Sequence, residues 1–309
     1  LSWFKIRIMR LLFVFVFLSS VAFGQNVYIP DANFKKYLVN NTKINTNGDD
    51  EIQLSEAVSF SGLIKCSYIR DLTGIESFSA LTELHCGYGY LKSLNITKNT
   101  ALTKLYCLGN GLTSLDVSKN TALTSLTCGA TNITSLDVSN NTALTYLSCM
   151  GNKLTSLDVS NNTALTGLNC SYNKLTSLDV SKNTALTNLD CGDNKLTSLD
   201  VSKNTALTYL FCQKNKLTRL DISNNTTLRE LYCQKNQLSS LGVSKNTALI
   251  RLSCGNNNLT SLDASNNPAL TDLDCSTNQL TSLDVSNNTA LTYLYCQKNK
   301  LTRLDISNN

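Results

Sequence analysis

A cysteine recurs every 21 residues along most of the chain, and this period constrains the fold more than any other feature. The spacing holds without a slip from Cys86 to Cys296, and a less regular first copy surrounds Cys66, 20 residues before Cys86. Self-similarity at a fixed period of this length is the signature of a solenoid, in which stacked repeats bury one continuous core. The repeats therefore predict an array rather than the two ordinary domains that a length of 309 residues would suggest.

Each repeat contains two similar halves, as the sequence LTYLSCMGNKLTSLDVSNNTA of residues 144–164 illustrates. The first half follows the pattern LxxLxCxxN and the second follows LxxLDVSxN. In the first half, Leu147 and Cys149 alternate with their neighbours, which is the two-residue period of a short strand. Stacked repeats therefore predict a parallel sheet on one side and short strands or extended segments on the other.

Asparagine closes each half of the repeat and forms two columns along the array. A chain that turns once per coil leaves backbone groups facing inward, and a side-chain amide can both donate to them and accept from them. We therefore interpret both columns as structural. Their members include Asn152, Asn173, Asn194 and Asn215 in one column, and Asn120, Asn141, Asn162 and Asn183 in the other.

The pattern LxxLxLxxN is the leucine-rich-repeat signature, and the doubled 21-residue unit resembles the IRREKO-type bacterial subclass over residues 63–309, about 11–12 repeats. This chain places Cys at the third Leu position and Val or Ile in LDV and LDI, and each change keeps an apolar side chain inward. The resemblance implies a right-handed, curved solenoid with its parallel sheet on the concave face. Similar bacterial repeat proteins, including the internalin-like ones, act as surface adhesins or interaction proteins.

Twelve cysteines in an exported protein ordinarily suggest disulfides. Here every repeat cysteine replaces an inward leucine, and a free thiol behaves as a small buried hydrophobe, so we predict a ladder of core thiols. The first alternative is disulfides between neighbouring coils, although directly opposed side chains on parallel strands point the same way. The second is a metal site, which a single line of thiolates without a CxxC or histidine cluster does not favour.

Residues 1–24 have the pattern of a secretory signal peptide. A basic start is followed by an apolar run from Leu11 to Phe23, and Ala22 and Gly24 are the small residues expected before cleavage at Gln25. An apolar run this short does not reach the ~20 residues that span a bilayer, so no membrane insertion is expected after cleavage. The sequence predicts a secreted or cell-surface protein.

Residues 25–62 differ from the repeats and predict a helical cap, with one helix at residues 31–39 and another from about Ser55. Residues 45–56 between them resemble an EF-hand loop. Asn at the first position and Asp50 where glycine makes the sharp turn depart from that pattern, and the alternative is a polar turn with Ser55 as N-cap. No cofactor is predicted other than calcium at this loop, whose candidate ligands are Asn45, Asn47, Asp49 and Glu56.

The repeats vary most at the outward positions around each cysteine, whereas TSLDVSxNTA barely changes. Exposed aromatic residues with a charged rim are typical of protein and glycan binding surfaces, although aromatic residues also pack between neighbouring strands. We predict one binding patch and a second aromatic group near the end of the chain. The patch is Tyr209, Phe211, Glu230, Tyr232 and Arg251, and the second group is Tyr293 and Tyr295.

Three classes of function follow from these features. The first is an extracellular binding or adhesion module for a protein or a glycan, and the second is a spacer or stalk that carries another domain. The third, an enzyme, is not favoured, because the chain has one histidine and no recognisable catalytic arrangement. Nucleic acid is not expected as a partner either, since removing Lys5, Arg7 and Arg10 with the signal peptide leaves 24 basic residues against 22 acidic ones.

Overall fold

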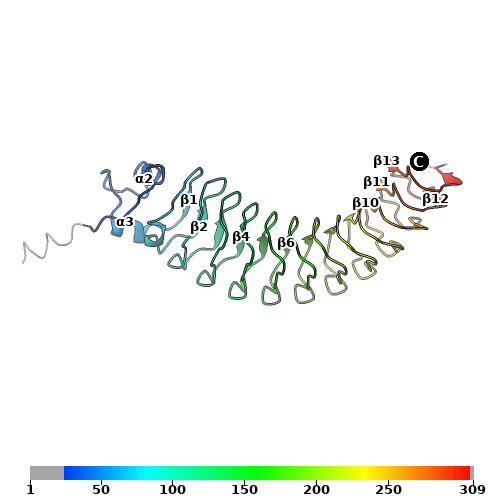
Figure 1. Ribbon diagram of the computed structural model, residues 1–309, viewed down its shortest axis with the longest axis horizontal. Coiled ribbons are helices and arrows are strands. Elements are labelled where there is room, and N and C mark those ends of the chain that lie inside the picture. Colours follow the sequence, from blue (N-terminus) through cyan, green and yellow to red (C-terminus); the bar gives the residue numbers. More distant parts are fainter. Residues whose placement is uncertain (1–23, 307–309) are drawn as a thin grey trace, which may run out of the picture.

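The computed structural model describes residues 24–306, which form one stack of coils bent into an arc (Figure 1). Two short helices, α2 (Ala32–Val39) and α3 (Leu54–Ser59), lie at one end of the arc, and strand β13 (Tyr293–Tyr295) lies at the other. The predicted signal peptide lies outside the described residues, apart from Gly24. Within residues 24–306, no helix is long and apolar enough to cross a bilayer.

Twelve three-residue strands form one parallel sheet along the stack, which confirms the predicted leucine-rich-repeat solenoid. Neighbouring strands pair with a 20-residue offset between β1 and β2 and with a 21-residue offset in every later pair. On the other side of the coils the chain is extended, and among the described residues it pairs as strands only near the end, where β12 meets β14. The remaining elements are β1 (Leu63–Lys65), η1 (Ile75–Ser77), β2 (Glu83–His85), β3 (Lys104–Tyr106), β4 (Ser125–Thr127), β5 (Tyr146–Ser148), β6 (Gly167–Asn169), β7 (Asn188–Asp190), β8 (Tyr209–Phe211), β9 (Glu230–Tyr232), β10 (Arg251–Ser253), β11 (Asp272–Asp274), β12 (Ser282–Asp284) and β14 (Arg303–Asp305).

One hydrophobic core runs through the stack, because both halves of each coil turn apolar side chains inward. In the coil of β5, Leu147 and Cys149 come from the half that contains the strand, which we call the strand half. Leu157 and Val159 come from the other half, which we call the return half. All four are buried, so apolar area is removed from water along the whole length of the coil.

The two asparagine columns satisfy backbone groups differently. In the strand half, Asn215 donates to the carbonyl oxygens of Cys191 (3.0 Å) and Cys212 (3.1 Å), and its own oxygen accepts from the backbone N–H of Leu196 (2.9 Å). In the return half, Asn204 donates to two backbone carbonyls, but its oxygen is buried and has no hydrogen-bond partner among the described residues. The structural role is confirmed for both columns, whereas acceptance by the amide oxygen is confined to the first.

The turn after each strand is left-handed, and most coils make it without glycine. Tyr172, Asp193 and Lys214 occupy equivalent positions in three successive coils, with φ of 54°, 52° and 52°. The backbone N–H groups of Tyr172, Asp193 and Lys214 donate to carbonyl oxygens of the next coil at 2.9–3.0 Å. Because each coil from Tyr88 to Thr277 repeats this bond, the stack holds a conformation that is unfavourable for residues with a Cβ.

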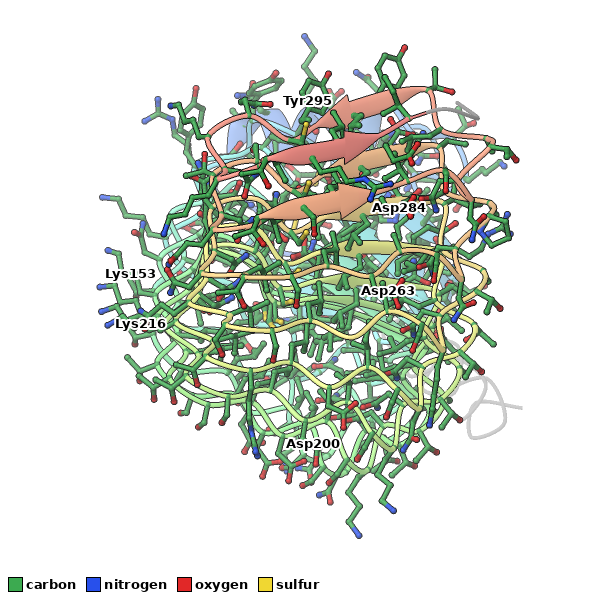
Figure 2. The ribbon with its side chains drawn as sticks, turned by 90° about the vertical axis from the view of Figure 1, so that its right-hand side faces the viewer. Lys153, Asp200, Lys216, Asp263, Asp284 and Tyr295 are labelled. Atoms are coloured by element: carbon green, nitrogen blue, oxygen red, sulfur yellow. The ribbon has the colours of Figure 1, made fainter. Side chains whose placement is uncertain are left out.

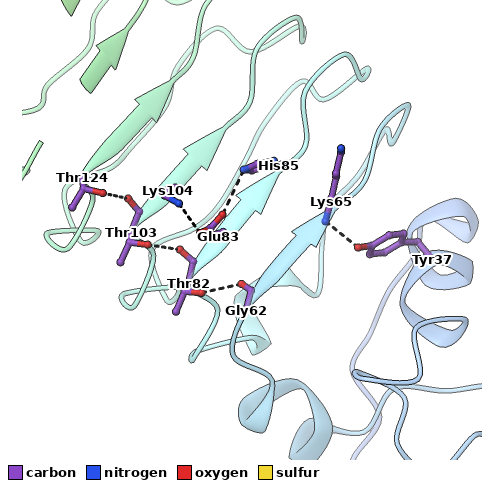
Figure 3. A network of polar contacts seen from close by, with 9 residues as sticks. All are labelled: Tyr37, Gly62, Lys65, Thr82, Glu83, His85, Thr103, Lys104 and Thr124. Atoms are coloured by element: carbon purple, nitrogen blue, oxygen red, sulfur yellow. Dashed lines mark hydrogen bonds and ion pairs between the residues drawn. The ribbon is translucent and has the colours of Figure 1, made fainter. Parts of the chain in front are cut away.

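The amino-terminal cap covers the first coil with its own apolar side chains, since Phe34 and Leu38 of α2 are fully buried. Figure 3 shows that the Tyr37 hydroxyl accepts a hydrogen bond from the backbone N–H of Lys65, at 2.9 Å. Lys65 belongs to β1, the edge strand of the sheet, so the cap closes an edge that would otherwise be open for pairing.

Helix α2 begins at Ala32, one residue after the predicted start, because Asp31 is its N-cap and its carboxylate accepts hydrogen bonds from the backbone N–H groups of Asn33 and Phe34. Helix α3 starts one residue before the expected position, and the prediction of Ser55 as its N-cap is wrong. Gln53 is the N-cap, and Glu56 accepts from the backbone N–H of Gln53 at 3.0 Å. The acidic residue three positions into the helix therefore caps it.

A column of threonines links successive coils beside the sheet. Thr82, Thr103 and Thr124 each donate a hydroxyl hydrogen bond to a backbone carbonyl of the preceding coil, over 3.0–3.1 Å (Figure 3). These bonds extend the inter-coil contacts beyond the three residues of each strand.

Candidate functional site

The outward side chains of the sheet form a surface that we call the sheet face. Each strand contributes its first and third residues, while the central leucine points into the core. The predicted patch lies on three adjacent strands of this face, β8, β9 and β10. The structure therefore brings its five residues together, although they span more than 40 positions in the sequence.

Three half-buried aromatic residues, Tyr209, Phe211 and Tyr232, form an aromatic ridge across β8 and β9. The Phe211 and Tyr232 ring centroids are 4.9 Å apart with an interplanar angle of 89°, and the Tyr209 and Phe211 centroids are 6.5 Å apart. Edge-to-face packing of this kind fixes the ring positions. The ridge is consequently a rigid apolar feature that needs little ordering when it meets a partner.

The charged rim of the ridge consists of Arg251 and the two acids beside it. Arg251 Nη1 lies 3.1 Å from Glu230 Oε1, and Arg251 Nε lies 3.6 Å from Asp272 Oδ2. These residues occupy equivalent positions on β9, β10 and β11. The rim therefore holds an arginine between two carboxylates, so its acidic charge exceeds its basic charge.

A hollow opens on each side of the ridge. The Asp190 hollow, of about 190 Å³, lies between Tyr146 and the ridge, with Leu168, Leu189 and Asp190 among its lining residues. Asp190 Oδ1 accepts from the backbone N–H of Gly192 at 3.1 Å. Burial raises the pKa of Asp190, and the hydrogen bond from Gly192 opposes that shift only in part.

The Asp274 hollow, of about 360 Å³, lies between Tyr232 of the ridge and Tyr295. Asp274 accepts from the backbone N–H of Ser276 at 3.0 Å and from the Ser276 hydroxyl at 2.6 Å. Tyr295 stands exposed at one end of the molecule (Figure 2), and Tyr293 beside it is also exposed. The two predicted aromatic groups are thus joined, because Tyr232 from one and Tyr295 from the other line the same hollow.

Charged residues also line other sides of the coils. Figure 2 places Lys153 and Lys216 on one side of the stack, and Asp200, Asp263 and Asp284 on a different side. The aspartates are exposed and each accepts a hydrogen bond from the backbone N–H of the serine two positions later. We interpret them as turn-forming residues, because their carboxylates are engaged by the local backbone.

All twelve cysteines lie within the described residues and all are free thiols, eleven of them buried and Cys296 half-buried. Burial raises the pKa of Cys149 and of Cys212 to about 12, which keeps these thiols protonated and unreactive. No group of three or more His, Cys, Asp or Glu side chains in residues 24–306 is placed to hold a metal ion. The cysteines accordingly form the predicted column of core thiols, which we call the cysteine ladder.

A protein of known structure also includes a cysteine ladder. The functional domain of InlJ from Listeria monocytogenes includes a cysteine ladder and is 34% identical to this chain, with a TM-score of 0.69. The match covers 92% of this chain and 74% of the InlJ domain. This chain belongs to the internalin-like leucine-rich-repeat proteins.

Two further solved structures resemble this internalin-like chain. An internalin, InlF, from Listeria monocytogenes has a TM-score of 0.73 at 22% identity, and the match covers 91% of this chain and 96% of InlF. The second is the leucine-rich-repeat ectodomain of the receptor kinase GASSHO1/SCHENGEN3 from Arabidopsis thaliana, solved in complex with CASPARIAN STRIP INTEGRITY FACTOR 2. It has a TM-score of 0.62 at 18% identity, and the match covers 74% of this chain and 34% of the ectodomain chain. At these identities the likeness concerns the fold. No protein-family model and no curated protein matches the sequence.

The EF-hand-like loop of this internalin-like protein uses its oxygens internally. Glu56 Oε1 accepts from the backbone N–H of Thr46 at 2.7 Å, and Asn45 Oδ1 accepts from that of Gly48 at 2.9 Å. Asp49 accepts from the backbone N–H of Glu51, and its other oxygen accepts from the Asn47 amide. Calcium binding stays a prediction, and it would require these oxygens to exchange N–H donors for the cation.

Sequence reasoning missed the residues that shape the hollows. Gly167 is the clearest, because a Cβ there would come within 2.9 Å of the Tyr146 ring. The missing side chain lets Tyr146 lean over β6 and leaves the floor of the Asp190 hollow open. A glycine among outward positions that otherwise carry side chains was a signal available in the sequence.

Proposed function

We propose that this internalin-like protein is an extracellular or cell-surface binding and adhesion module that recognises a protein or a glycan through the sheet face. The observation that carries this proposal is the aromatic ridge, with a hollow on each side and a charged rim beside it. Solvent-accessible aromatic residues beside hollows are the usual anchors of binding surfaces.

Two further observations support the assignment. Export is supported by the signal-peptide pattern of residues 1–24. Protein binding is supported by the use of this fold in the plant ectodomain solved with CASPARIAN STRIP INTEGRITY FACTOR 2 and in the LRIM1/APL1C complex.

A binding role is favoured over an enzymatic one. The single histidine, His85, faces Glu83 at 3.9 Å and packs against Tyr106, with a ring centroid distance of 5.7 Å. Because the cysteine ladder is largely buried, its thiols are not available as nucleophiles. The histidine and the buried thiols are therefore used in packing and lie apart from the hollows.

The test is a triple substitution of the ridge, Tyr209→Ser, Phe211→Ser and Tyr232→Ser. Binding in a cell-surface pulldown and on a glycan array should fall at least tenfold, because truncating buried aromatic anchors ordinarily costs on the order of 2 kcal/mol or more. The matched control replaces three exposed tyrosines near the cap, Tyr28, Tyr68 and Tyr90, by serine. Circular dichroism and thermal melts check that both variants stay folded.

If the ridge variant binds as well as the wild type, the sheet-face proposal is wrong. That result would favour the alternative function, a spacer that holds another domain away from the surface.

A further inference from the structure

The two hollows are related by an exact shift of four coils. Asp190 and Asp274 stand 84 residues apart, as do Leu189 and Leu273, and Phe211 and Tyr295. In all, seven of the eight residues that line the Asp274 hollow stand 84 positions after a residue that lines the Asp190 hollow. Both hollows thus contain an apolar floor, an aspartate at the equivalent position and an aromatic wall, and the Asp274 hollow is also lined by the paired Arg251 and Asp272.

Each of these aspartates lacks a basic partner. Among the outward strand residues from β7 to β13 the only cation is Arg251, which pairs with Glu230 and Asp272. Within residues 24–306, neither Asp190 nor Asp274 makes an ion pair, and the backbone N–H and serine hydroxyl groups that donate to them are neutral. A partly buried carboxylate held by neutral donors attracts a cation more strongly than an exposed one does.

The aromatic walls favour the same ligand charge. A ring face attracts an ammonium or guanidinium group through its quadrupole, and this attraction grows as water is excluded. Phe211 lines the hollow of Asp190, and both Tyr232 and Tyr295 line that of Asp274. Carboxylate and ring therefore both attract a cation through its charge, whereas a neutral sugar would gain only hydrogen bonds to the carboxylate and packing on the ring.

We propose that the Asp190 and Asp274 hollows bind two cationic side chains, lysine or arginine, carried by one protein partner. This inference rests on the sheet face being the binding surface, as proposed above. Four steps between strands of ~4.8 Å each place the two hollows about 19 Å apart. Since an extended segment advances ~3.3 Å per residue, it would carry its two basic residues about six positions apart.

The test uses a synthetic peptide in which two arginines are separated by five glycine and serine residues, titrated to millimolar concentration into the purified protein. Asp190→Asn and Asp274→Asn should each weaken binding about tenfold, because each removes one of two linked contacts. The matched control is Asp158→Asn, which removes the same charge from an exposed residue of the return half that also accepts from a backbone N–H two positions later. Its affinity should equal that of the wild type.

Two comparison peptides sharpen the result. Replacing one arginine by glutamine should weaken binding at least tenfold, and placing the two arginines next to each other should do the same. Added salt should weaken binding of the two-arginine peptide, because the partly exposed carboxylates are screened. The proposal is overturned if the wild type does not bind this peptide, if the all-glutamine peptide binds equally well, or if the Asp190→Asn/Asp274→Asn double variant keeps wild-type affinity.

The cell-surface pulldown separates this inference from the function on which it rests. Loss of attachment in the ridge variant together with loss in the double aspartate variant supports both. If only the ridge variant loses attachment, and the double aspartate variant still attaches to a neutral oligosaccharide, the binding function is supported and the cationic ligand is overturned. Retention of attachment in both variants overturns both.

Discussion

The strand half and the return half of each coil bury similar leucine stripes, yet the strand half varies far more on its outer surface. In the strand half, backbone groups pair with the neighbouring coils, so outward residues such as Tyr146 and Gly167 differ freely. In the interior coils the return half lacks such a ladder, and side chains take its place: Asp158 accepts from Ser160, and Asn162 donates to carbonyls of the preceding coils. Sequence is thus constrained where side chains do the hydrogen bonding that a sheet does with its backbone.

The largest effects are expected in the two asparagine columns. Asn215→Ala in the strand half removes two hydrogen bonds to backbone carbonyls and the one that the Leu196 N–H donates, whereas Asn204→Ala in the return half removes two hydrogen bonds to carbonyls. The carbonyls keep a second donor in both variants, so only the Leu196 N–H loses its partner. At about 1.5 kcal/mol for each buried hydrogen bond that is lost, the losses are about 4.5 and 3 kcal/mol. Urea unfolding gives the loss in unfolding free energy for each variant. A greater loss for Asn204→Ala than for Asn215→Ala would contradict the assignment of the fuller hydrogen-bond network to the strand half.

An intermediate and equal effect is expected when a hydroxyl enters the core from either half. Cys170 of the strand half and Val180 of the return half are both fully buried. Cys170→Ser and Val180→Thr keep the approximate shape and place a hydroxyl in apolar surroundings, which costs about 2 kcal/mol. Thermal and urea unfolding should give similar losses for the two, since both stripes face one core.

The size-matched comparison is Cys170→Ala, which removes the sulfur without adding a polar group. If Cys170→Ser proves more stable than Cys170→Ala, the serine hydroxyl has found a partner and the surroundings of the cysteine ladder are less apolar than the burial indicates.

Sequence periodicity was sufficient to predict the solenoid, the cysteine ladder and the clustering of the Tyr209 patch, because stacking at a fixed period turns sequence offsets of 21 into neighbours. It was not sufficient for features set by side-chain volume and turn conformation. The hollow beside Tyr146 depends on how one ring leans over Gly167. The left-handed turn at Lys214 carries no glycine signal, because the hydrogen bonds of the stack impose it. Sequence reasoning missed Gln53 as the N-cap of α3, because the hydrogen bond at this helix start is the one that the Gln53 backbone N–H donates to Glu56.

The smallest effects, of opposite sign, are expected from two aspartates ten residues apart on the two halves. Burial raises the pKa of Asp190, so its ionisation destabilises the fold as the pH rises through the usual carboxyl range toward the raised pKa. The backbone hydrogen bond from Ser202 lowers the pKa of exposed Asp200, so its contribution is present above the usual carboxyl pKa and is lost as the pH falls through the lowered one. At pH 7, Asp190→Asn should therefore leave the protein as stable or slightly more stable, whereas Asp200→Asn should cost less than about 0.5 kcal/mol after screening by water.

Thermal melts of both variants from pH 3 to pH 7 measure the sign of each stability change. The differences from wild type should shrink at the acid end, where the wild-type carboxyls become neutral, and a stability gain for Asp200→Asn at pH 7 would contradict the assigned signs. A gain at Asp190 joined to a loss of binding would mean that the strand half keeps a carboxylate that the fold does not need. A residue of that kind is retained for what it contacts outside the molecule. The two variants therefore compare the strand half as a binding surface with the return half as a scaffold.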